Sequence, residues 1–186
     1  MSKIARQFIR KIPKTDLHVH LDGSLRIGSL IEMAKREQVE LPSYEESGLN
    51  ELVFKDRYKN LGEYLSCFTY TVGVLQTEEH LERAAFELAE DAHEEGVRYM
   101  EVRFAPQLHI NHSTETAAIV QAVNRGLHRA KRHLNASIGE NDLAFEYGII
   151  LCALRCFTRH MSPYYNRLIN RCGSSRKRLI LSLIHI

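Results

Sequence analysis

Two histidines separated by one residue are the feature of this sequence whose types and spacing point most directly to chemistry. They lie in the stretch Asp16-Leu-His-Val-His-Leu-Asp-Gly-Ser24. In a β-strand His18 and His20 project from the same side, because side chains alternate along the strand. Two neighbouring imidazoles can bind one divalent cation, and zinc suits nitrogen ligands with further open positions best among the common ions. Spacing alone does not name the metal.

The two residues that follow suggest a place for a ligand. Asp22 either continues the row of the histidines or lies just past the strand, where a ligand would dock. Gly23 permits the backbone to turn sharply and to approach a substrate closely. A His-x-His pair by itself is usually incidental, but its place at the end of an N-terminal strand, followed by Asp-Gly, favours a functional site.

Alternating strands and helices must position these residues. Strands are predicted at Thr15–Leu21, Val97–Phe104 and Phe145–Leu154, the last apolar enough to be buried on both faces. Helical spacing marks four segments, separated by a polar connection over 39–60. These helical segments are Ile27–Gln38, the first part of Leu61–Leu75, a helix capped by Thr77 and closed by Gly96, and Thr116–Leu134.

This alternation predicts the α/β class with a parallel sheet. No glycine-rich phosphate loop follows the first strand, which argues against a dinucleotide-binding fold. A (β/α)8 barrel keeps its reacting groups at the C-terminal ends of its strands, and the His-x-His pair has that position. The fold class expected is therefore a partial (β/α)8 TIM-type barrel, with about the first three βα units.

The composition indicates a soluble globular protein. The chain has 186 residues, of which 44% are hydrophobic and 26% charged. No apolar run approaches the roughly 20 residues that cross a bilayer. Residues 1–14 lack the apolar region of a secretory signal, and the four cysteines show no paired spacing. We expect a cytoplasmic protein without membrane contact.

Three segments resemble the adenosine deaminases of the amidohydrolase superfamily. The first is Thr-Asp-Leu-His-Val-His-Leu-Asp-Gly-Ser-Leu from Thr15, which is similar to the family's N-terminal signature. The second, Glu95–Pro106, is similar to the second barrel strand. The third, Leu61–Phe68, resembles the amphipathic helix that covers the nucleoside pocket. The resemblance spans roughly residues 10 to 155, so that residues 1–155 are expected to form the N-terminal part of the barrel domain.

The resemblance implies a role for each matching residue. His18 and His20 would be ligands of a single zinc ion, with His20 also beside the substrate. Asp22 would hydrogen-bond the purine ring, and Gly23 would allow the ring to approach. An apolar lid would come from one helix face, whose other interpretation is an ordinary face packed on the core. The residues of that face are Leu61, Tyr64, Leu65 and Phe68.

The resemblance also implies a hydrolytic reaction. Zinc lowers the pKa of a water molecule, whose oxygen adds to C6 of the purine, and ammonia leaves after protonation. In the family a third histidine and an aspartate complete the metal site, a glutamate protonates the ring, and another histidine orients the attacking oxygen. All four follow residue 155 in the family, so no catalytic residue is assigned in this chain, which is expected to be an inactive fragment.

The expected function is deamination of adenosine or 2'-deoxyadenosine to the inosine products in purine salvage. The partner is then a small-molecule purine nucleoside, with no nucleic acid and no membrane. Asp22 favours a nucleoside, because the adenine deaminase branch shows glutamate in this context. The alternatives are a related deaminase acting on adenine or an N6-substituted AMP, and a non-catalytic fragment.

Residues 156–186 differ in composition from the rest of the chain. They contain no acidic residue and six of the 25 Lys and Arg residues. Such a tail can contact nucleic acid, but its abrupt start after the third strand favours a frameshift or read-through segment outside the fold.

The remaining histidines and two further residues have ordinary interpretations. His109 and His112 follow the second strand and are candidates to line the pocket. Arg103 is expected to have a structural role, facing outward or in an ion pair, and Cys152 to be a buried core residue. Solvent exposure is expected for His80, His93, His128 and His133.

Overall fold

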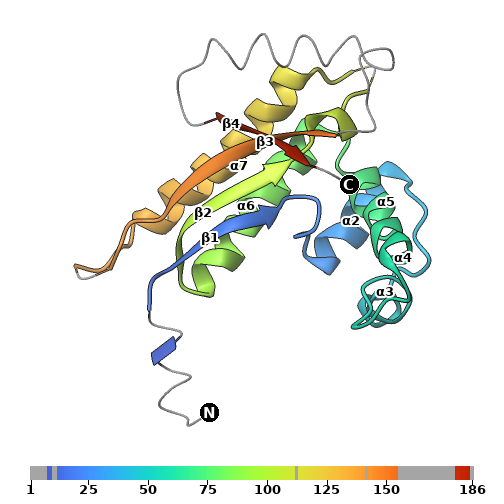
Figure 1. Cartoon of the computed structure of the whole chain (residues 1–186), viewed down its shortest axis with the longest axis horizontal. Coiled ribbons are helices and arrows are strands. Elements are labelled where there is room, and N and C mark those ends of the chain that lie inside the picture. The colour runs from blue at the N-terminus through green and yellow to red at the C-terminus, as the bar shows by residue number, and fades with distance from the viewer. Residues whose placement is uncertain (1–7, 10–11, 112, 141, 155–178, 185–186) are drawn as a thin grey trace.

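One parallel sheet organises the molecule. The computed structural model describes residues 8–9, 12–111, 113–140, 142–154 and 179–184, the last range by its backbone only. The strand order is β1-β2-β3-β4, and every neighbouring pair is parallel (Figure 1). This confirms the α/β class and agrees with part of a barrel. The strands are β1 (Lys14–His20), β2 (Val97–Phe104), β3 (Glu146–Leu154) and β4 (Leu179–Ile184).

Two long helices pack against one face of the sheet, α6 (Glu78–Glu94) and α7 (Thr116–Asn135) (Figure 1). The main core lies between them and the sheet. On β2, Met100, Val102 and Phe104 are buried in this core, while the residues between them are half-buried on the opposite face. This period of two is the alternation that the sequence predicts for a strand with two different faces.

Local signals set both ends of α6, as predicted. The hydroxyl of Thr77 accepts a hydrogen bond from the N–H of His80 at 3.2 Å, and Glu78 and Glu79 lie in the first turn. Carboxylates there interact favourably with the helix dipole. After the helix, Gly96 has a φ of 90°, a left-handed conformation that favours glycine. No helix in the described ranges is long and apolar enough to cross a membrane.

A group of short helices gathers beyond the C-terminal end of β1 (Figure 1). They are α2 (Ile27–Glu37), α3 (Glu46–Leu52), α4 (Leu61–Ser66) and α5 (Phe68–Val74). The segment 39–60 was expected to be a polar connection, but it contains the helix α3. Its one buried residue is Leu49, which is fully buried, and a single apolar contact leaves no periodicity to detect. The segment 61–75 is helical nearly throughout, with the two helices meeting at Cys67.

The fourth strand comes from the segment expected to lie outside the fold. Leu179–Ile184 runs parallel to β3, from the pair Ile149↔Leu179 to the pair Leu154↔Ile184. Such pairing needs only an extended segment at an open sheet edge, so the expectation that the segment lies outside the fold stays a prediction. Residues 155–178 and 185–186 lie outside the described residues, and their origin stays a prediction.

A glycine sets the distance between α6 and α7. A Cβ atom at Gly126 would lie 2.1 Å from the carbonyl oxygen of Glu82 and 2.9 Å from Cβ of Ala85. The obstacle is mainly backbone, so no side-chain rotation relieves it. The two helices approach as closely as they do because residue 126 has no side chain.

We predict that Gly126→Ala destabilises the chain. Overpacking costs about 1–3 kcal/mol, and the better helix propensity of alanine offsets about 1 kcal/mol of it. Gly73→Ala in α5 is the matched control, since its Cβ would lie 3.4 Å from Val39 Cγ1, an ordinary contact. Urea unfolding measures both, and a midpoint for Gly126→Ala equal to or above that of Gly73→Ala would contradict the close helix contact.

Candidate metal centre

His18 and His20 lie side by side at the C-terminal end of β1. Their Nε2 atoms are 3.4 Å apart, and their ring centroids are 5.4 Å apart. Both project from the same side of the strand, and Val19 between them packs on the main core. The alternation inferred from the sequence therefore brings the two imidazoles together.

The separation of the two nitrogens fits a shared zinc ion. Nitrogens bound at about 2.0–2.1 Å with tetrahedral angles lie about 3.3 Å from each other. Two facing lone pairs need a proton or a cation between them, and the 3.4 Å spacing has room for either. Within the described residues no group of three or more His, Cys, Asp or Glu side chains converges.

Asp22 lies next to the pair, just past the strand. Its Oδ1 is 3.8 Å from Nδ1 of His20, beyond hydrogen-bond distance, and the residue is 8% exposed. This Oδ1 is buried and has no hydrogen-bond partner. A nearby carboxylate favours the proton on Nδ1, which leaves the lone pair of Nε2 free for a metal. Asp22 also retains an open acceptor for a ligand.

Gly23 and Phe68 form a close contact beside the histidines. A Cβ atom built at Gly23 would lie 3.4 Å from Cε1 of Phe68 and 3.6 Å from Cβ of His20. Any side chain at position 23 would therefore fill the space between the strand end and α5. Of the four predicted lid residues, Phe68 is the one that reaches this point.

The other lid residues are arranged behind Phe68. Tyr64 makes an edge-to-face contact with Phe68, with centroids 5.5 Å apart. Leu61 is 66% exposed and Tyr64 44% exposed, while Leu65 is half-buried. The helix α4 has no buried residue at all. These side chains form an outer apolar surface rather than a face packed on the core, and their substrate contacts stay a prediction.

Arg103 and Cys152 lie on the same face of the sheet as the histidines. Arg103 pairs with His20 across β1 and β2, and its guanidinium donates to the carbonyl of Leu17 at 2.9 Å. Arg103 was expected to face outward or to form an ion pair, but this hydrogen bond goes to a backbone carbonyl, and its Nε is buried without a hydrogen-bond partner. Cys152 is fully buried, as predicted, and burial raises the pKa of its thiol to about 11 against the opposing charge of Arg103.

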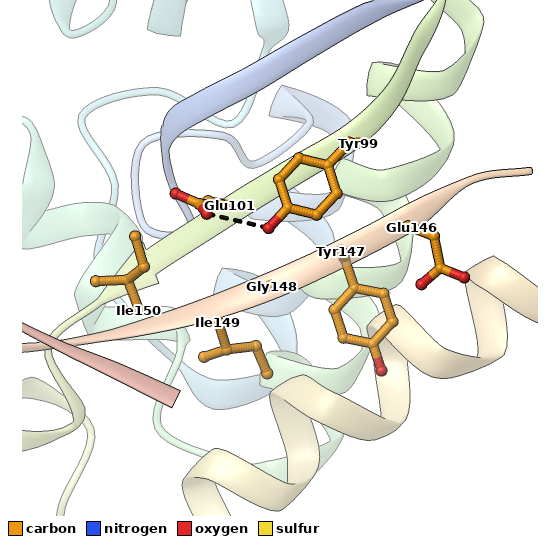
Figure 2. Close-up of a pocket in the computed structure, with 7 residues that line it drawn as sticks. All are labelled: Tyr99, Glu101, Glu146, Tyr147, Gly148, Ile149 and Ile150. Carbon is orange, nitrogen blue, oxygen red and sulfur yellow. Dashed lines mark hydrogen bonds between the residues drawn. The ribbon is translucent and has the colours of Figure 1, made fainter. Parts of the chain in front are cut away.

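A separate hollow of about 380 Å³ lies over the N-terminal halves of β2 and β3. Figure 2 shows Tyr99 and Glu101 on one side of it, where the tyrosine hydroxyl donates to the carboxylate at 3.0 Å. Reacting groups in (β/α) folds lie at the opposite, C-terminal ends of the strands. This hollow is therefore not the candidate site.

Two buried histidines were not identified as such from the sequence. His80 was expected to be exposed but is 2% exposed, and His109 is fully buried. His80 precedes Ala84 and Leu88 by four and eight residues, so its place on the buried stripe of α6 was a readable signal. His93 is half-buried, His128 and His133 are exposed as expected, and His112 lies outside the described residues.

Comparison with known proteins identifies the family. Residues 13–178 match the family model described as adenosine deaminase. The chain belongs to the adenosine deaminase family. The match runs past residue 155, where the resemblance was expected to end.

Two relatives show how much of the family's length is present. The adenosine deaminase of Vibrio atlanticus is 46% identical over 120 residues, which are 64% of this chain and 36% of that protein. A probable adenosine deaminase of Dictyostelium discoideum is 38% identical over 162 residues, which are 87% of this chain and 19% of that protein. The chain thus spans about a third of the first relative and about a fifth of the second.

Solved structures show the same fold at low identity. An amidohydrolase of Burkholderia ambifaria with bound zinc gives a TM-score of 0.74 at 18% identity, covering 100% of this chain and 48% of its own. The N6-methyl-AMP deaminase of Arabidopsis thaliana gives 0.69 at 21%, covering 97% and 52%. The adenine deaminase of Arthrobacter aurescens gives 0.69 at 23%, covering 94% and 49%. These likenesses support the barrel assignment and do not select a substrate.

We predict that this chain binds zinc through the Nε2 atoms of His18 and His20. Long-range ¹H–¹⁵N spectra should show zinc shifting both Nε2 resonances while the Nδ1 resonances stay protonated. Replacing both histidines by alanine should remove the binding, whereas alanine at the exposed His128 and His133 should leave it unchanged. Equal zinc uptake by the two double variants would contradict the assignment.

Proposed function

We propose that this chain supplies the first part of a zinc-dependent enzyme that deaminates adenosine and 2'-deoxyadenosine by hydrolysis, in purine salvage. The observation that carries the proposal is the pair of Nε2 atoms 3.4 Å apart, at the C-terminal end of the first strand in a chain of this family. When bound, zinc supplies Lewis-acid chemistry that lowers the pKa of water toward neutrality. The cytoplasmic location expected from the sequence remains part of the proposal.

The residues of this chain hold and orient the reactants. His18 and His20 hold the ion with Nε2. Asp22 presents its unpartnered Oδ1 to a donor group of the substrate, and its burial strengthens that hydrogen bond because water competes weakly there. Phe68 closes the side next to Gly23 and excludes water from that edge of the site.

The preference for a nucleoside rests on Asp22. Its shorter side chain leaves more room beside the histidines than a glutamate would, and a nucleoside is larger than the free base. A buried acceptor that hydrogen-bonds a substrate group also rejects analogues that lack the group. Adenine and N6-substituted AMP are therefore the competing substrates that the test includes.

The test is a chimera in which residues 13–154 replace the corresponding segment of the Vibrio atlanticus adenosine deaminase. We expect turnover of adenosine and 2'-deoxyadenosine, with kcat/KM at least about 100-fold above that for adenine or an N6-substituted AMP. His18→Ala with His20→Ala should lower kcat/KM at least about a thousandfold through loss of the metal chemistry. Formation of the 6-oxopurine product, followed by chromatography, measures all substrates on one scale, because an N6-substituted AMP releases an amine instead of ammonia.

The chimera with alanine at His128 and His133 is the control and should keep its activity. Undiminished turnover after loss of His18 and His20 would remove the metal assignment, and a preference for adenine or an N6-substituted AMP would replace the proposed substrate. Since no third ligand converges within the described residues, we expect the 186-residue chain alone to show no measurable turnover.

A further inference from the structure

The C-terminal end of α5 is held by side chains from two other segments. The carbonyl of Val74 accepts from Nδ1 of His80 at 2.8 Å, and the carbonyl of Leu75 accepts from Nδ1 of His109 at 2.8 Å. His80 belongs to α6, and His109 follows η1 (Pro106–Leu108), the short 3-10 turn after β2. Carbonyl groups at a helix end have no partner inside the helix, so such donors stabilise the end.

A second pair of hydrogen bonds joins the residue after the C-cap of α5 to the loop after β2. Gln76 donates its amide to the carbonyl of Leu108 at 3.0 Å, and Asn111 donates to the carbonyl of Gln76 at 2.7 Å. The residues after α5 and the loop after β2 are therefore joined in both directions. At the opposite end of α5 the N-cap residue Cys67 donates its thiol to the carbonyl of Val53 at 3.1 Å, and the next residue, Phe68, lies against Gly23.

The hydrogen bond of His109 determines which of its nitrogens carries the proton. A carbonyl oxygen only accepts, so Nδ1 must donate to Leu75. In the neutral imidazole Nε2 is then an acceptor, and it is buried without a hydrogen-bond partner. Burial lowers the pKa of His109, which the hydrogen bond to Leu75 and the charge of Asp22 oppose.

We propose that His109 is a positioning residue: through Nδ1 it fixes the end of α5 to the loop after β2, and so sets where Phe68 lies over Gly23 and His20. The mechanical link is short, because α5 has seven residues from Phe68 to Val74. A helix fixed at one end by a buried hydrogen bond directs the side chain at its other end. The functional meaning of this placement rests on the proposed deaminase site, but the geometry is testable without turnover.

The test compares three forms of the 186-residue chain by amide hydrogen exchange: the unaltered chain, His109→Leu and His109→Asn. Leucine fills the space without a donor, whereas the amide of asparagine can place an N–H where Nδ1 lies. We expect exchange of the amides in 71–75 to rise about three- to tenfold in His109→Leu, and to return close to the unaltered rate in His109→Asn. The amides of α7 report global unfolding, and His133→Leu is the control at an exposed histidine.

Two measurements on the unaltered chain keep the proposal testable if His109→Leu does not fold. Long-range ¹H–¹⁵N spectra should show the proton of His109 on Nδ1, and nuclear Overhauser effects should connect the Phe68 ring to Gly23 Hα. In His109→Asn this contact should persist. Three results would overturn the proposal. The first is a proton on Nε2 of His109 alone, and the second is amide exchange in 71–75 that is unchanged in His109→Leu. The third is exchange in His109→Asn that stays as fast as in His109→Leu. None of these outcomes depends on zinc binding or on the substrate. A failure of this proposal can therefore be told apart from a failure of the proposed function.

Discussion

The placement of His18 and His20 on one side of β1, at and just after the register shift between Asp16 and Val19, is the constraint on which the rest of the site depends. The strand turns His18 and His20 to one side of the sheet and Val19 to the other, where Val19 packs on the main core. The core contact fixes the rotation of the strand about its axis, so the imidazoles cannot turn away from each other. Parallel pairing with β2 then places the pair at the strand end, beside Arg103. A slip of one residue in this register would send the histidines into the core.

The residues around His18 and His20 differ in burial, and neighbouring groups therefore have different chemical roles. His18 is exposed and His20 half-exposed, as befits groups that accept a ligand from outside. Asp22, Cys152 and His109 are buried, where water does not screen their charges or hydrogen bonds. The thiol of Cys152 stays protonated in this setting because burial raises its pKa. The candidate site therefore has an open edge at the two histidines and a closed polar interior, with the helices α4 and α5 beside them.

Much of the architecture was predictable because local signals and packing agree. The three strands, α2, α6 and α7 each carry a periodicity long enough to identify, and the ends of α6 follow from Thr77 and Gly96. Where the periodic segment is short, the sequence did not predict the helix. The helix α3 buries only Leu49, and the β-branched end of segment 61–75 is helical because its packing outweighs its propensity. His80 was misjudged from its charged neighbours, although its helical position is a buried one.

By itself the sequence predicted that His18 and His20 lie together, since residues two apart in a strand share one side, and it determined the family through motifs in order. Tertiary structure decided what those residues meet. The contact of Phe68 with Gly23, the burial of His109 and its bond to Leu75 each join segments more than 30 residues apart. The pairing of β4 with β3 joins residues 30 positions apart, from Ile149↔Leu179 to Leu154↔Ile184. No local sequence pattern encodes such contacts, because they depend on how several helices and strands pack against one another.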